Sequence, residues 1–155
     1  LAGCSASKPD MYVEDGAYNL SAQEYIDRIN EVVAIQNDSR YLEIPDFESS
    51  GETIEIDSFF LEVKISTNTN GNITEIKYSW DGARDDIGYS VGLYTGYTME
   101  LLGFGDSDAV YDQLDMMNPA STGYETSYSE AGTLFSYWVY GYGQYNHLTI
   151  APEEA

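Results

Sequence analysis

His147 is the residue best suited to acid–base chemistry, because it is the only histidine of the chain. A histidine becomes a catalytic base when a nucleophile and an acid are arranged around it. Here His147 alternates with Tyr145 and Thr149, as residues on one face of a strand do. The sequence therefore favours an ordinary strand histidine, and we predict no catalytic residue.

Carboxylates gather in two segments, 81–86 and 106–108. A calcium site needs several oxygens that converge from one loop, and the EF-hand spacing with its terminal glutamate is present in neither segment. Helix caps and a solvated surface account for such residues, so we predict no metal site and no cofactor. A hydrolase that uses two carboxylates on cell-wall polymers stays open as an alternative, because their separation is a three-dimensional property.

Aromatic residues crowd into the last third of the chain, where the runs 124–129, 134–142 and 145–151 alternate as strands do. Exposed tyrosine and tryptophan are the usual material of recognition surfaces, and flat rings also stack on sugars. The alternative is that these wide side chains line the core and its rim. The candidate binding residues are Trp138, Tyr140, Tyr142, Tyr137 and Tyr145.

The charge of the chain limits its partners. The sequence has 27 Asp and Glu against 6 Lys and Arg, a formal net charge of −21. Such a surface repels phosphate backbones, so nucleic acid binding is excluded. With one cysteine, Cys4, no internal disulfide is available and the core must hold by packing.

Leu1-Ala2-Gly3-Cys4 resembles the lipobox that closes a bacterial lipoprotein signal peptide. The resemblance implies that Cys4 carries a lipid and becomes the first residue of the mature protein. Two acyl chains, at about 0.8 kcal/mol per buried methylene, would hold the protein stably on a membrane. The expected location is therefore extracytoplasmic, on the bacterial cell membrane, and the chain is similar in style to small acidic lipoproteins of Gram-positive bacteria.

The remaining elements predict an α+β fold, with an antiparallel β-sheet and two or three helices packed on one of its faces. Ser21 and Glu24 form a capping box, so a helix begins at Ala22. Between residues 54 and 65 the apolar positions change parity near Ser58, which indicates a bulge or a bend in one strand. The other expected elements are an edge strand or loop at 41–47, a hairpin closed by the turn 68–72, and helices at 85–102 and from 106–108 to before Pro119.

The predicted organisation has three parts: a lipobox remnant (1–4), a flexible tether (5–18) and a single α+β domain (19–155). The anchor, the small size and the lack of catalytic motifs favour a non-catalytic binding module. It would present a face rich in tyrosine and tryptophan to a protein or a glycan. The alternatives are the carboxylate hydrolase and a structural subunit of an envelope complex.

Overall fold

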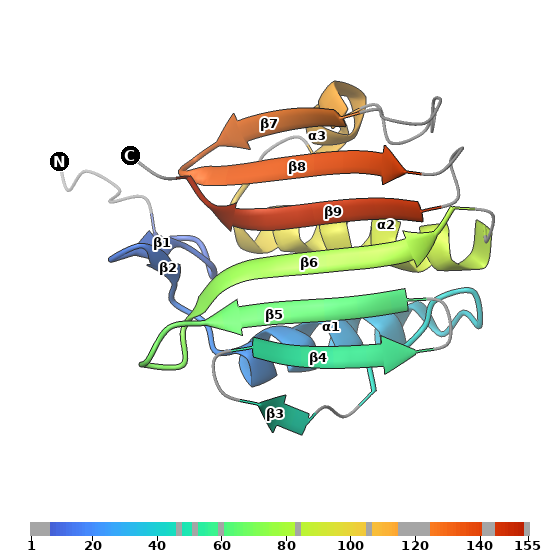
Figure 1. Cartoon of the computed structure of the whole chain (residues 1–155), viewed down its shortest axis with the longest axis horizontal. Helices are drawn as coiled ribbons and strands as arrows, with labels where there is room; N and C mark the ends of the chain where they lie inside the picture. Colours follow the sequence, from blue (N-terminus) through green and yellow to red (C-terminus); the bar gives the residue numbers. More distant parts are fainter. Residues whose placement is uncertain are drawn as a thin grey trace, which may run out of the picture.

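The computed structural model describes residues 7–45, 48–50, 53–58, 61–82, 85–104, 107–114, 125–140 and 145–153. Within these ranges the chain forms one seven-stranded antiparallel sheet with three helices behind it, and a two-stranded hairpin at one end of the sheet (Figure 1). The predicted α+β class is confirmed.

Nine strands and three helices follow one another in the described residues. The hairpin consists of β1 (Val13–Glu14) and β2 (Ala17–Tyr18), and the helices are α1 (Ala22–Gln36), α2 (Asp85–Leu101) and α3 (Ser107–Leu114). The sheet strands are β3 (Glu48–Ser50), β4 (Thr53–Ser58), β5 (Leu61–Thr67), β6 (Ile73–Asp81), β7 (Glu125–Glu130), β8 (Thr133–Tyr140) and β9 (Tyr145–Pro152). Their order across the sheet is β3-β4-β5-β6-β9-β8-β7, so β9 returns between β6 and β8.

Helix α1 begins where the capping box predicts. The backbone N–H of Glu24 donates to Ser21 Oγ at 3.1 Å, and the backbone N–H of Ser21 donates to the Glu24 carboxylate at 2.8 Å. These two bonds satisfy donors that the first helical turn leaves unpaired. The helix ends at Asn37, which adopts the left-handed conformation. Its apolar stripe, built from Tyr25, Ile26, Ile29 and Val33, is buried against the sheet side of the molecule.

The parity change near Ser58 has a different cause from the one predicted. β4 and β5 are two antiparallel strands, with Ser58 opposite Leu61 and Ile54 opposite Ile65. Because the chain reverses direction here, the apolar positions change parity without a bulge. Of the two forms predicted for 41–47, an edge strand or a loop, the described part, 41–45, takes the loop.

Alternation along the strands divides the sheet into a core face and an outer face. On β8, Phe135, Tyr137 and Val139 are buried while the residues between them are partly exposed. The three helices cover the core face, and in Figure 1 the outer face points toward the viewer with no described element in front of it. An antiparallel sheet with one solvated face reads as this alternation of buried and open positions.

The N-terminal segment joins the fold earlier than predicted. Met11 and Tyr18 are 0% exposed, and the backbone N–H of Met11 donates to the carbonyl of Leu101 at 2.9 Å. Burial of these side chains holds residues 11–18 on the domain, so the predicted tether of 5–18 is corrected: the folded part begins before residue 19. Cys4 lies outside the described residues. No helix in the described ranges is long and apolar enough to cross a membrane.

A chain of buried hydroxyls links α1, β6 and α2 inside the core. Thr98 Oγ1 donates to the carbonyl of Tyr94 at 2.7 Å, which leaves its oxygen free to accept from the Tyr25 hydroxyl at 2.7 Å. The Tyr25 oxygen in turn accepts from the Tyr78 hydroxyl at 2.6 Å. The hydroxyls of Thr98, Tyr25 and Tyr78 thus all have partners, as buried polar groups require.

Candidate functional site

The aromatic residues that meet on the outer face surround His147. In the register of the sheet, His147 on β9 lies between Ser79 on β6 and Trp138 on β8. The indole of Trp138 stacks on the imidazole, with ring centroids 5.1 Å apart and 17° between the ring planes. The His147 cluster is defined here as Lys77, Ser79, Trp138, Tyr140, Tyr145 and His147.

Tyr140 and Tyr145 form the open end of this cluster. They lie directly opposite each other, at the last position of β8 and the first of β9. Their ring centroids are 5.6 and 5.8 Å from that of His147. Tyr140 is 58% exposed and Tyr145 56% exposed. The two tyrosines therefore present ring surface to solvent at one end of the sheet.

Ser79 fixes the orientation of the histidine ring. Its Oγ lies 2.8 Å from His147 Nδ1, and no other hydrogen bond between described residues involves this hydroxyl. Whichever of the two atoms donates, this bond occupies Nδ1 and leaves Nε2 as the open ring nitrogen. Burial and the nearby charge of Lys77 lower the pKa of His147, which favours the neutral imidazole.

Lys77 brings a positive charge to the edge of the cluster. Its Nζ lies 5.4 Å from the centroid of the Trp138 ring, within cation–π range. Across the sheet it lies directly opposite Lys64. The ion pairs between described residues join Arg28 to Asp10 and Arg40 to Asp38, so none of them involves Lys77.

The structure unites only part of the predicted set. Trp138, Tyr140 and Tyr145 share the outer face, as alternation requires. Tyr137 is wrong as a surface residue: it is 1% exposed, and its ring lies 6.2 Å from that of Trp80 in the core. Because it sits one position from Trp138 on the same strand, it must point to the opposite face. Tyr142 lies outside the described residues.

Sequence reasoning missed two members of the cluster, Lys77 and Ser79, and gave His147 no part in it. The alternation of Tyr145 with His147 placed both on one face of β9, which was a usable signal. Lys77 and Ser79 belong to β6, and β9 pairs with this strand from 68 residues further along the chain. Local pattern carries no information about that pairing.

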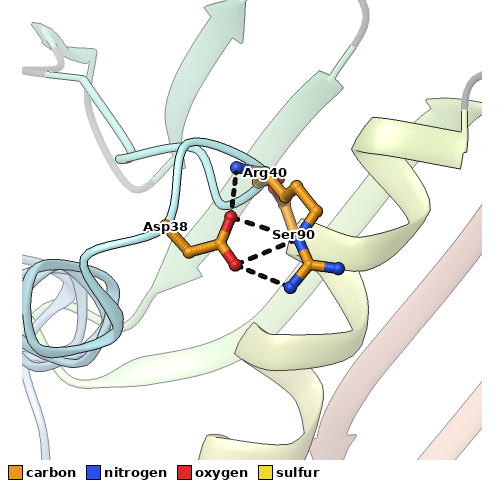
Figure 2. A network of polar contacts seen from close by, with 3 residues as sticks. All are labelled: Asp38, Arg40 and Ser90. Carbon is orange, nitrogen blue, oxygen red and sulfur yellow. Dashed lines mark hydrogen bonds and ion pairs between the residues drawn. The ribbon is translucent and has the colours of Figure 1, made fainter.

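The Gly-x-Ser-x-Gly pattern of serine hydrolases occurs once in the chain, at Gly88-Tyr89-Ser90-Val91-Gly92. The prediction of no catalytic residue overlooked it. That pattern places a nucleophile on a tight turn between a strand and a helix. Ser90 instead lies inside α2 and is 0% exposed. It accepts from the backbone N–H of Leu42 at 2.9 Å and donates to the carbonyl of Arg40 at 3.3 Å. Figure 2 shows Ser90 on the helix beside Arg40. The match is therefore coincidental, and Ser90 fastens the loop after α1 to α2.

The same loop holds the shorter of the two ion pairs among the described residues. Arg40 Nη2 lies 2.6 Å from an oxygen of Asp38 (Figure 2). The Arg40 guanidinium also stands over the ring of Tyr89, 5.7 Å from its centroid. The hydrogen bonds from Arg40 lower the pKa of the Asp38 carboxyl. Both side chains bond within one tight loop, so this pair shapes the loop and offers no reactive group.

The described residues do not form the arrangement that a serine hydrolase or a metal site needs. The hydrogen bonds between them join His147 to Ser79 and to no carboxylate, and Ser79 is only 4% exposed. A serine hydrolase needs an exposed serine and an acid on the far nitrogen of the histidine. No group of three or more His, Cys, Asp or Glu in the described residues is placed to hold a metal ion.

Comparison with known proteins gives no relative from which a role could be transferred. No family model, no curated protein and no solved structure matches this chain.

Proposed function

We propose that this protein is a lipid-anchored, extracytoplasmic recognition module that binds its ligand on the outer face of the sheet, at the His147 cluster. The observation that carries the proposal is the exposure of Tyr140 and Tyr145, both above half, on a face that no described element covers. Exposed aromatic rings on a rigid sheet bind ligands at little entropic cost.

The place of the N-terminal hairpin in the fold supports this role. Val13 of the N-terminal hairpin lies near the turn that precedes β8, since its Cγ2 is 3.9 Å from the Cβ position of Gly132. The Tyr18 hydroxyl is 3.0 Å from Thr133 Oγ1, at the start of β8. Tyr140 ends the same strand, roughly 23 Å further on at about 3.3 Å per residue. Figure 1 shows the hairpin at the end of the sheet where β8 begins, and the end of β8 on the opposite side. A tether that leaves near the hairpin would therefore hold the His147 cluster away from the membrane.

The surroundings of His147 favour binding over hydrolysis. Ser79 occupies Nδ1 with a hydroxyl that is 4% exposed, and three aromatic rings pack around the imidazole. These contacts fix the ring in place, and the serine beside it is closed to a substrate. The same rigidity favours ligand binding, because a preorganised surface loses less conformational entropy when the ligand binds.

The lipid anchor is tested by mass spectrometry of the protein isolated from its own cells. A modified Cys4 with the mass of acyl chains is expected, and Cys4→Ala should release the protein from the membrane fraction. An unmodified thiol in membrane-bound material would contradict the anchor without bearing on the sheet face.

The binding face is tested by photo-crosslinking on intact cells. A photoreactive phenylalanine replaces Tyr140 in one variant and Tyr89 in the control, since Tyr89 lies on α2 and is 54% exposed. Crosslinked material, protein or glycan, is expected at position 140 in clear excess over position 89. Equal capture at both positions would refute the proposal.

A further inference from the structure

We infer that the ligand of the His147 cluster is a neutral polysaccharide. The inference rests on the proposed function, because it names the class of ligand that this recognition surface takes. Three independent features of the surface support it: its hydrogen-bonding groups, its open rings and its charged surroundings.

The cluster offers hydrogen-bond donors that have no acceptor within the described residues. The ammonium of Lys77 brings three donors to the edge of the Trp138 ring, and no hydrogen bond between described residues uses them. Nε2 of His147 is a further open group, because Ser79 occupies Nδ1, and it can exchange a hydrogen bond with a hydroxyl in either tautomer. The hydroxyls of Tyr140 and Tyr145 are likewise unbonded among described groups. A ligand rich in uncharged acceptor oxygens complements this set, and sugar hydroxyls and ring oxygens are such acceptors.

The open rings supply the apolar half of a sugar site. Tyr140 and Tyr145 are cross-strand neighbours, with Cβ atoms about 5 Å apart as the sheet geometry requires. Each contacts His147 and stays more than half exposed, so ring surface remains for a ligand. The C–H face of a pyranose packs on such a ring, while its hydroxyls reach the donors beside it.

The charges around the cluster disfavour two other classes of ligand, an anionic polymer and a protein. The net charge of −21 repels an anionic polymer at long range. A protein partner would cover about 800 Å² of this surface, and the centre of such an interface is poor in charged residues. Here the outward positions beside the cluster include Glu62, Lys64, Glu75 and Glu125. A narrow aromatic strip bounded by charges fits a single polysaccharide chain.

The inference is tested by ¹⁹F NMR of the protein labelled with 5-fluorotryptophan. The chain has two tryptophans. Trp138 reports on the cluster, whereas Trp80, 5% exposed on the core face, is an internal reference for folding. The probes are neutral cello-, xylo- and manno-oligosaccharides, with oligogalacturonate as the anionic arm. At least one neutral series should shift the Trp138 signal saturably and leave the Trp80 signal in place.

Variants separate a specific site from general stickiness. Tyr140→Ala combined with Tyr145→Ala should weaken the sugar affinity about ten-fold, as loss of central aromatic contacts does. Lys77→Met should weaken it about three-fold, the effect of one lost hydrogen bond. Lys8→Met is the matched control, because Lys8 also stands over an aromatic ring, that of Tyr12 at 4.7 Å, but at the other end of the chain. It should change nothing.

Three results would overturn the inference: no neutral oligosaccharide moves Trp138, only oligogalacturonate moves it, or Lys8→Met weakens binding as much as Lys77→Met. If the sugars fail while crosslinking at position 140 still exceeds that at position 89, the ligand is of another class and the recognition surface stands. If crosslinking shows no preference for position 140, the recognition surface itself is refuted.

Discussion

Removing the hydroxyl of Tyr25 should destabilise the protein far more than removing that of Tyr78, although each change deletes one oxygen. Both side chains are 0% exposed, and phenylalanine fills the same space. The difference comes from the direction of the hydrogen bonds. Tyr78 donates at the start of the chain of hydroxyls, whereas Tyr25 accepts from Tyr78 and donates to Thr98.

The magnitudes follow from what each substitution leaves behind. Tyr78→Phe removes one bond and leaves the Tyr25 oxygen still donating to Thr98, a cost of about 1 kcal/mol. Tyr25→Phe removes two bonds and leaves the Tyr78 O–H buried without an acceptor. Two lost bonds and one orphaned donor amount to about 2–4 kcal/mol. In the double variant the orphaned donor is gone, so its loss should not exceed that of Tyr25→Phe alone.

Urea unfolding followed by circular dichroism measures these three variants against the parent, with equal m-values as the condition for comparison. The expected order of stability is parent, Tyr78→Phe, then the double variant at or above Tyr25→Phe. Equal losses for the two single variants, or a double variant that loses their sum, would show that the hydroxyls act independently and would refute the directional chain.

Three further changes are expected. Burial raises the pKa of Tyr25 and of Tyr94 to about 12, so the unfolded chain loses these protons first as the pH rises above 10. The free energy of unfolding should therefore fall by about 1.4 kcal/mol per pH unit for each tyrosine. Urea unfolding at alkaline pH measures this fall. The pKa of His147 is lowered in the folded protein, so as the pH drops below the ordinary value of 6.5 the histidine takes up its proton first in the unfolded chain. The free energy of unfolding should therefore fall as the pH drops below 6.5. In Lys77→Met, NMR titration should show the pKa of His147 rising toward its ordinary value. Ala131 has φ 52° in the turn between β7 and β8, a conformation that asparagine tolerates better than alanine. Ala131→Asn should therefore stabilise the protein by about 0.5–1 kcal/mol in thermal unfolding. An unchanged melting temperature would contradict this explanation of the turn.

Local chemistry was sufficient to predict most of the elements. The capping box at Ser21 and Glu24 marked the start of α1, and the alternation in the last third of the chain marked β7, β8 and β9. It failed where two readings share one pattern. A change of parity near Ser58 fits a bent strand as well as a reversal into a new strand, and only the pairing of β4 with β5 separates them.

The sequence by itself determined that Trp138 and Tyr140 share a face, because side chains on a strand alternate. It could not decide which face lies against the helices, and so it could not separate the exposed rings from the buried Tyr137. The tertiary structure made that decision when the helices covered one side of the sheet. It also placed β9 between β6 and β8, which brings Lys77 to the rings of β8 and β9. Contacts between strands so distant in the chain depend on the packing of the whole sheet, which no local pattern of residues encodes.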